Sequence, residues 1–275
     1  MINIGDHELC LPYGNYESVD KRKYEFFDIY CHGWKQNANL TLDWFPMDTQ
    51  ELFEYNVKNN PENKGLLKYI DNPITYKLNE YSFRADSFDT KEPGNVFLGC
   101  SHTFGVGNHL DHLWAYKLNK VVGGKFFNLG SPGHGISTSL RLLRYWSTKL
   151  NIKNIFHYQP RYHRYEFYKE DKNNPPAVEI EYISGHRDLV KLKDYNLRDA
   201  LSSDQNLLEL YKNSQLAISG IAQALGINYY CYMPSREGYY EDESLNTRIN
   251  PARDLAHFPL SINNKILESF KSKLI

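Results

Sequence analysis

The feature that most constrains the fold is an alternation that begins at Asn95. From there on, short apolar runs that suit buried strands alternate with longer stretches of helical periodicity. Short strands separated by helices pair in parallel, and the helices then cover both faces of the sheet. The pattern therefore predicts an α/β fold with a mostly parallel sheet. The expected strands are Val96–Leu98, Lys125–Asn128, Ile155–Tyr158 and Ile227–Tyr232.

Helical periodicity fills the segments between and after these strands. The helix from Asp204 to Leu225 has the clearest ends, because Ser203 suits its N-cap and Gly226 suits the position just after its last turn. The other expected helices lie around Asp111–Leu118, Ser137–Leu150 and Ile262–Phe270.

Residues 1–92 have no clean period, and they are expected to form an N-terminal extension or a small β-rich subdomain. Within them, Tyr24–Tyr30 and Leu40–Phe45 suit strands, Asp48–Asn56 suits a short helix capped by Asp48 or Thr49, and Ile74–Arg84 suits a hairpin. The main domain is expected over residues 93–275, with an insertion around 160–200. A hairpin that includes Val178–Ile183 is expected in that insertion.

Bulk composition narrows the classes of partner. The 275 residues carry a net charge of −1, which argues against a protein that binds nucleic acid through phosphate contacts. The chain is rich in tyrosine, with 22 residues. Tyrosine is common on surfaces that meet sugars or other proteins, including second copies of a chain, but also at the edges of ordinary cores. Homo-oligomer formation through a tyrosine-rich surface therefore stays open.

Neither a metal site nor a targeting segment is evident. The four cysteines form no Cys-x-x-Cys pair, so they are expected to be reduced core thiols, and no cofactor is expected. His109 and His112 have a spacing that suits metal, but no carboxylate or cysteine cluster accompanies them. No signal peptide and no membrane-spanning run is recognised, so synthesis in the cytoplasm is expected and the final location stays open.

A serine follows the first strand of the alternation in the segment Gly99-Cys100-Ser101. A sharp turn from a strand into a helix presents one side chain at the carboxyl edge of the sheet, where ligands of open α/β sheets bind. Such a serine is either a cap or a nucleophile. A nucleophilic serine needs a base, and the base needs a group that orients it. Asp254 and His257 lie three apart in a loop after the last strand and could supply both, although a surface loop whose Asp caps the last helix is the plainer alternative.

A glycine-rich turn follows the second strand, with the sequence Asn128-Leu129-Gly130-Ser131-Pro132-Gly133. Its glycines could bring a backbone N–H close to a developing oxyanion. A tight turn or a phosphate-binding turn is the alternative. A turn that binds the phosphates of a nucleotide fits the sequence poorly. The glycine spacing is not Gly-x-Gly-x-x-Gly, and Pro132 has no backbone N–H to donate.

Together, these three segments resemble the SGNH (GDSL-like) hydrolase family. Leu98 to Gly105 is similar to its nucleophile block, Asn128 to Gly133 to its glycine block, and Asp254 to His257 to its Asp-x-x-His block. The resemblance covers roughly residues 76–270 and implies a flavodoxin-like, three-layer α/β/α fold. It also implies ester hydrolysis through an acyl-enzyme.

The resemblance assigns roles to single residues. Ser101 would be the nucleophile, His257 the base and then the acid, and Asp254 the group that orients His257. The backbone N–H groups of Ser101 and Gly133 would hold the oxyanion.

The chain departs from the family pattern at two places. Cys100 stands where the family has an Asp, at a position outside the triad. The family's oxyanion Asn is absent after the third strand, where Gln159 or Arg161 would have to donate instead. Losing one such donor typically costs about 10²–10³ in rate.

Several charged and imidazole side chains near these blocks are candidates for binding substrate. They are His102, His134, Arg161 and Arg253. Arg248 and Arg253 would bind an anionic or sugar substrate, or else pair with the acidic run Glu241-Asp242-Glu243.

The expected function is that of a serine esterase or O-deacetylase that acts on a carbohydrate or a small ester. Two alternatives stay open. One is a catalytically weak or inactive binding module that keeps the fold. The other is an O-acyltransferase, because an acceptor alcohol attacks the same acyl-enzyme as water does.

Overall fold

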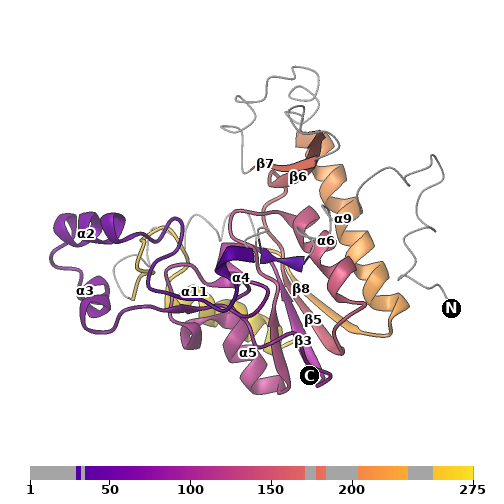
Figure 1. The fold of residues 1–275 in the computed structure, drawn as a ribbon, viewed down its shortest axis with the longest axis horizontal. Coiled ribbons are helices and arrows are strands. Elements are labelled where there is room, and N and C mark those ends of the chain that lie inside the picture. The colour runs from indigo at the N-terminus through magenta and orange to yellow at the C-terminus, as the bar shows by residue number, and fades with distance from the viewer. Residues whose placement is uncertain (1–28, 32–34, 171–177, 184–203, 235–249, 275) are drawn as a thin grey trace.

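A four-stranded parallel sheet forms the centre of the molecule (Figure 1). The computed structural model describes residues 29–31, 35–170, 178–183, 204–234 and 250–274. The strands β3 (Gly94–Leu98), β4 (Lys125–Asn128), β5 (Ile152–Tyr158) and β8 (Asn228–Tyr232) lie in the order β4-β3-β5-β8, and all neighbours are parallel. The expectation of an α/β fold with a parallel sheet is confirmed.

The order of the strands places a crevice at the carboxyl end of β3. The chain leaves β3 for the neighbouring strand β4, and then crosses back to the other side of β3 to form β5. In an open parallel sheet, the loops at such a reversal separate and leave room for a ligand. Ser101 follows β3 directly, so it lies at this point of the sheet.

Helices cover both faces of the sheet and make three layers. The helices α6 (Ile136–Trp146) and α9 (Asp204–Ala224) pack against each other on one face, and α5 (Trp114–Val122) and α11 (Leu260–Lys271) pack on the other. All five residues of β3 are buried. Because successive side chains of a strand point to opposite faces, Val96 joins the cluster under α6 and α9, and Phe97 the cluster under α5 and α11.

The segment between β3 and α5 differs from the expected single helix. A four-residue helix, α4 (Ser101–Phe104), begins immediately after the β3 turn, and the short 3-10 helix η5 (Leu110–His112) precedes α5. Gly105 ends α4 in the left-handed conformation with φ 90°. A Cβ at that position would also lie 2.5 Å from a methyl carbon of Leu113. Gly105 therefore ends α4 and allows the chain to pack closely against Leu113.

The described part of residues 1–92 contains more helix than strand. It contains the 3-10 helix η4 (Lys35–Asn37), β1 (Thr41–Leu42), α2 (Gln50–Asn59), α3 (Lys64–Asp71) and β2 (Tyr76–Lys77). Thr49, one of the two residues expected to cap α2, is its N-cap. The Thr49 hydroxyl accepts a hydrogen bond from Leu52 N. Helix α3, which the sequence did not predict, is capped by Asn63.

The expected hairpin over residues 74–84 is wrong, because β2 pairs with the distant strand β1. The side chain of Asn79 explains the difference. Its Oδ1 accepts hydrogen bonds from the N–H groups of Tyr81 and Phe83, which turns the chain tightly and leaves no second strand. Of the strand expected over Leu40–Phe45, only Thr41–Leu42 forms, and most of Tyr24–Tyr30 lies outside the described residues.

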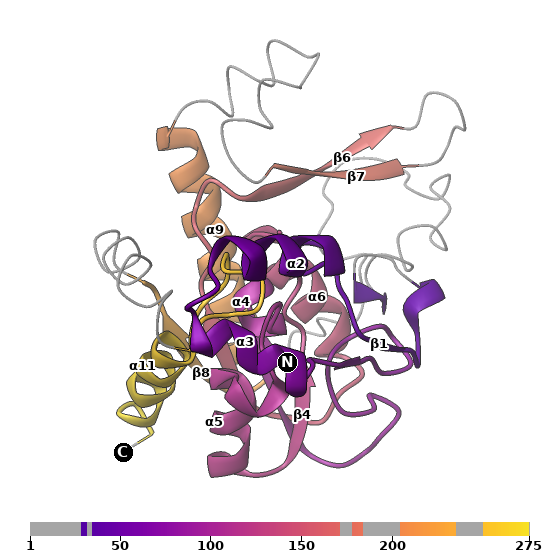
Figure 2. The ribbon, with the colours of Figure 1, turned by 90° about the vertical axis from the view of Figure 1, so that its left-hand side faces the viewer.

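Residues of this N-terminal segment share one hydrophobic cluster with the sheet. Buried members from the segment include Leu66, Tyr76 and Phe88, and they belong to the same cluster as Leu98 and Trp146. Helix α2 lies beside the loop that carries Asp254, as Figure 2 shows. The segment therefore supports the site loop directly.

Strands β6 (Tyr165–Glu170) and β7 (Val178–Ile183) pair antiparallel in the region where an inserted hairpin was expected. Glu166 anchors β6 to helix α6. Its carboxylate accepts hydrogen bonds from Arg141 Nε at 2.8 Å and from Thr138 Oγ1 at 2.7 Å, and all three side chains are buried.

No helix among the described residues is long and apolar enough to cross a membrane.

Candidate active site

Ser101 is the first residue of α4, at a turn that only glycine permits. Gly99 has φ +151°, and a Cβ there would overlap Thr103 Oγ1 and lie 2.9 Å from Tyr158 O. The turn therefore requires both an unusual backbone conformation and close contact with the neighbouring strand. Ser101 is 4% exposed.

The Asp–His loop holds its carboxylate in one orientation. Asp254 Oδ2 bonds to His257 Nδ1 in a short contact. Asp254 Oδ1 accepts hydrogen bonds from the backbone N–H groups of Ala256 and His257, both at 3.1 Å. Leu255 adopts a positive φ of 56° to close this turn. Because Nδ1 is occupied by the carboxylate, Nε2 is the ring nitrogen left for proton transfer.

Several contacts hold the Asp–His loop against the segment that follows Ser101. Arg253 N donates to Gly107 O at 2.8 Å, and Asn108 Nδ2 donates to Phe258 O at 3.1 Å. Gly107 has φ 71°, and a Cβ there would lie 2.8 Å from Asp254 Oδ1. The structure therefore brings the two predicted halves of the triad to one place.

His102 forms a further contact between the two halves. Its ring stacks on Phe258 with centroids 3.5 Å apart, and lies edge-on to the ring of His257 at 5.2 Å. No hydrogen bond joins Ser101 Oγ to His257, two residues that the structure describes. Such bonds are often long in unliganded enzymes and shorten when substrate binds.

The glycine turn packs against the nucleophile turn. Ser131 N donates to Gly99 O at 2.9 Å, and a Cβ on Gly130 would lie 2.5 Å from Phe104 N. Gly133 has φ 78° and no atom within 4 Å of the place a Cβ would occupy, so it faces open space. His134, expected to bind substrate, is buried, and its Nδ1 bonds to Ser131 Oγ at 2.5 Å. It therefore helps to hold the shape of the turn.

The two candidates for the third oxyanion donor occupy different places. Gln159 is completely buried, and its Oε1 accepts a hydrogen bond from Tyr211 of α9 at 3.0 Å. Gln159 directly follows β5 and continues its alternation, because Ile155, four residues earlier, also faces the α9 layer. Arg161 instead lines a pocket beside His102. Of the two, Arg161 is the better placed to meet a substrate.

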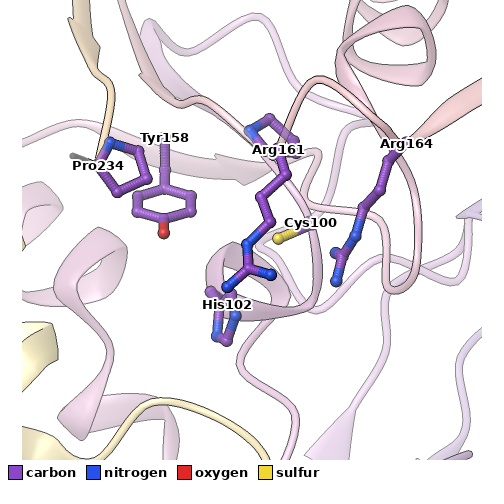
Figure 3. A pocket seen from close by; sticks show the side chains of 7 residues that line it. Cys100, His102, Tyr158, Arg161, Arg164 and Pro234 are labelled. Atoms are coloured by element: carbon purple, nitrogen blue, oxygen red, sulfur yellow. The ribbon is translucent and has the colours of Figure 1, made fainter. Parts of the chain in front are cut away.

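This pocket is lined by residues from three segments of the chain, shown in Figure 3: Cys100, His102, Tyr158, Pro160, Arg161, Arg164 and Pro234. Cys100 and His102 are the two neighbours of Ser101 in the chain. Arg164 was not predicted as a site residue. The signal that could have found it is Arg-x-x-Arg at the end of a strand, because the first and fourth residues of a turn lie close together.

Burial and nearby positive charges keep His102 neutral. Burial is the main reason that its pKa falls well below the ordinary value of 6.5, and the charges of His257, Arg164 and Arg161 lower it further. The effect of the two arginines on this pKa reflects their closeness to the ring. A neutral His102 can line the pocket without adding a third fixed positive charge.

Arg253 does not bind substrate in the way expected from the sequence. Its guanidinium is buried, pairs with the buried carboxylate of Asp48 at 2.7 Å, and lies 3.9 Å from the ring centroid of Trp44. Tyr76 completes the cluster, since its hydroxyl donates to Asp48 and accepts from Gly107 N. Arg253 thus ties the Asp–His loop to the N-terminal segment. Arg248 and its expected acidic partners lie outside the described residues.

The cysteines and histidines of the described residues form no other site. Cys31, Cys100 and Cys231 are free thiols, and burial raises the pKa of Cys31 to about 12. No group of three or more His, Cys, Asp or Glu side chains suited to a metal ion occurs in the described part of the chain. His109 and His112 contact each other through their rings.

Comparison with known proteins does not identify a family. No model of a known protein family matches the chain, and no curated protein matches it.

Proposed function

We propose that this protein is a serine ester hydrolase of the SGNH type. The order of its parallel strands, with the first flanked by the second and the third, agrees with a flavodoxin-like sheet. The observation that carries the proposal is the Asp254–His257 pair, held by Arg253 and Asn108 against the turn that presents Ser101. The loop that carries an oriented histidine therefore packs against the segment that carries a serine at the carboxyl edge of the sheet, which supports the proposal.

In the proposed reaction, Ser101 Oγ attacks the carbonyl carbon of an ester while His257 Nε2 takes its proton. Asp254 holds the ring and stabilises the imidazolium. The N–H groups of Ser101 and Gly133 and the guanidinium of Arg161 stabilise the oxyanion. His257 then gives its proton to the leaving alcohol. Water attacks the acyl-enzyme in the second half, with His257 again as base, and releases the acid and free Ser101. The substrates would be O-acyl groups of carbohydrates or small esters.

Hydrolysis of an aryl acetate tests this proposal. Replacing Ser101 or His257 by alanine should lower kcat about 10⁶-fold if the triad acts as a unit, and Asp254→Asn should lower it about 10⁴-fold. Ser272→Ala, which removes an exposed hydroxyl at the end of α11, is the matched control and should retain full activity. Equal activity of Ser101→Ala and wild type would reject the proposal.

A non-catalytic binding module is the second candidate. Ser101 is nearly buried, and no hydrogen bond joins it to His257, although the structure describes both residues. This candidate predicts no turnover of any ester by a folded protein. An acyltransferase would instead turn over the ester faster when an acceptor alcohol is added, and would form a new ester.

A further inference from the structure

Two arginines point into the pocket beside the proposed nucleophile. Arg161 and Arg164 lie at the two ends of one turn, closed by a hydrogen bond from Arg164 N to Arg161 O at 3.2 Å. Figure 3 shows both guanidinium groups extending toward the same space, close to His102 and Cys100. Because the first and fourth residues of a turn lie close together in space, both charges belong to this one pocket.

The positive charge of Arg164 has no carboxylate partner in the described part of the chain. Its Nε is buried and has no hydrogen-bond partner. A buried donor on a charged group is costly when it has no partner. An acceptor from outside the chain would relieve that cost.

The rest of the pocket offers nothing negative. Its other lining residues are a cysteine, a tyrosine, two prolines and the neutral His102. The arginines that are buried in the described part of the chain all have acceptors within it. Arg84 donates to three backbone carbonyl oxygens. Arg141 pairs with Glu166, and Arg253 pairs with Asp48. Arg164 is half-buried and differs from these arginines, because its buried Nε has no acceptor among the described residues.

The turn that carries the arginines is packed onto the glycine turn of the site. A Cβ on Gly135 would overlap the carbonyl oxygen of Arg164, so the two turns are in direct backbone contact. Gly135 closely follows Gly133, the proposed oxyanion donor. The arginines are thus held relative to the reaction centre by rigid backbone contacts, as a specificity pocket requires.

We propose that this pocket binds an anionic group of the substrate, a carboxylate or a phosphate, so that the enzyme prefers acidic esters to neutral ones. This inference rests on the proposed ester hydrolysis. Planar guanidinium groups bind both kinds of anion through paired N–H donors. Arg161 contributes to the oxyanion site and to the anion pocket, and Arg164 belongs to the anion pocket alone.

The first test compares kcat/KM for a neutral ester, 4-nitrophenyl acetate, with two carboxylate esters. Mono-4-nitrophenyl succinate carries the anion on the acyl side, and 4-acetoxybenzoate carries it on the leaving-group side. Arg164→Gln should lower the ratio of anionic to neutral kcat/KM about tenfold to a hundredfold for one of the two, given the strength of charged hydrogen bonds. Arg164→Lys keeps the charge but loses the paired N–H donors of the guanidinium group. Its ratio should therefore lie between those of Arg164→Gln and the wild type. Arg144→Gln removes an exposed arginine of α6 as the matched control and should leave the ratio at the wild-type value.

The second test measures binding without turnover. Inorganic phosphate and acetate are titrated into folded Ser101→Ala protein by calorimetry, with and without Arg164→Gln. The pocket predicts saturable binding of at least one anion, weakened at least about tenfold by Arg164→Gln. If esters are hydrolysed but neither the ratio nor anion binding depends on Arg164, the anion pocket is refuted and the esterase stands. If no ester is hydrolysed but Arg164 is required for anion binding, the esterase fails and the pocket stands.

Discussion

Arg253 and Asp254 are adjacent in one loop, and each makes a different contact that fixes the loop. Asp254 orients His257, whereas Arg253 enters a fully buried ion pair with Asp48 and lies over the Trp44 ring. Removing one member of a buried pair leaves the other charge without compensation, and the energy lost is then larger than the pair itself contributes. In the proposed enzyme, Asp254 therefore takes part in the chemistry, whereas Arg253 holds the loop in position.

Arg253→Met should destabilise the protein by about 3–5 kcal/mol, because Asp48 would remain buried and charged. The free energy of unfolding from a guanidinium titration measures this. Asp48→Asn combined with Arg253→Met removes both charges and keeps the hydrogen bond from Tyr76, so the double variant should be more stable than Arg253→Met alone. A double variant that is less stable than Arg253→Met would contradict this account of the cluster.

At the scale of elements, the inner strands β3 and β5 could be predicted because their central residues are buried on both faces. The runs at Val96–Leu98 and Ile155–Tyr158 carry apolar side chains on both sides, and this pattern needs no knowledge of neighbours. The caps of α2 and the glycine after α9 could also be predicted, since they act within a few residues. The fold class and the three blocks of the proposed site were therefore accessible from local pattern.

The rest depended on contacts between distant parts of the chain. Arg253 and Asp48 are 205 positions apart, and no local pattern indicates that they pair. Strand β2 consists of two residues and forms only because β1 lies next to it. Gln159 follows β5 directly, so whether its amide faces α9 or the pocket is decided by the register of the sheet.

The turn between β3 and α4 should tolerate no side chain at Gly99. Gly99→Ala would combine a disfavoured φ of +151° with overlap of Thr103 Oγ1, so we expect a loss of several kcal/mol in stability and loss of ester hydrolysis. Gly226→Ala is the matched control. Gly226 has φ +66° but no atom within 4 Å of its Cβ position, so its substitution should cost only about 1–2 kcal/mol. Equal losses of stability in the two variants would show that crowding at Gly99 is unimportant.

At the scale of the whole molecule, the stability should fall in mild acid because of buried neutral histidines. Burial lowers the pKa of His157 to about 3, and that of His102 also falls well below 6.5. The unfolded chain binds these protons near pH 6.5 and the folded chain does not. Below that pH, each histidine removes about 1.4 kcal/mol of stability per pH unit until its folded pKa is reached.

Unfolding titrations between pH 7.5 and 4.5 measure this slope. His157→Gln keeps a polar group opposite Tyr229, to which His157 Nδ1 bonds at 3.0 Å. The stability of the His157→Gln variant should depend less steeply on pH below 6.5. The difference in slope corresponds to about one proton fewer taken up on unfolding. Identical slopes for the variant and the wild type would mean that His157 is protonated in the folded protein.

The most direct test of the central claim is labelling by a fluorophosphonate probe, followed by peptide mass spectrometry. The probe phosphonylates a serine only when a base activates it, and the measurement needs no knowledge of the natural substrate. We predict that the label is found on Ser101, that Asp254→Asn slows labelling by about three to four orders of magnitude, and that Ser272→Ala labels like the wild type. Folded wild-type protein that carries no label on Ser101, or that labels equally fast without Asp254, would contradict the proposed serine hydrolase.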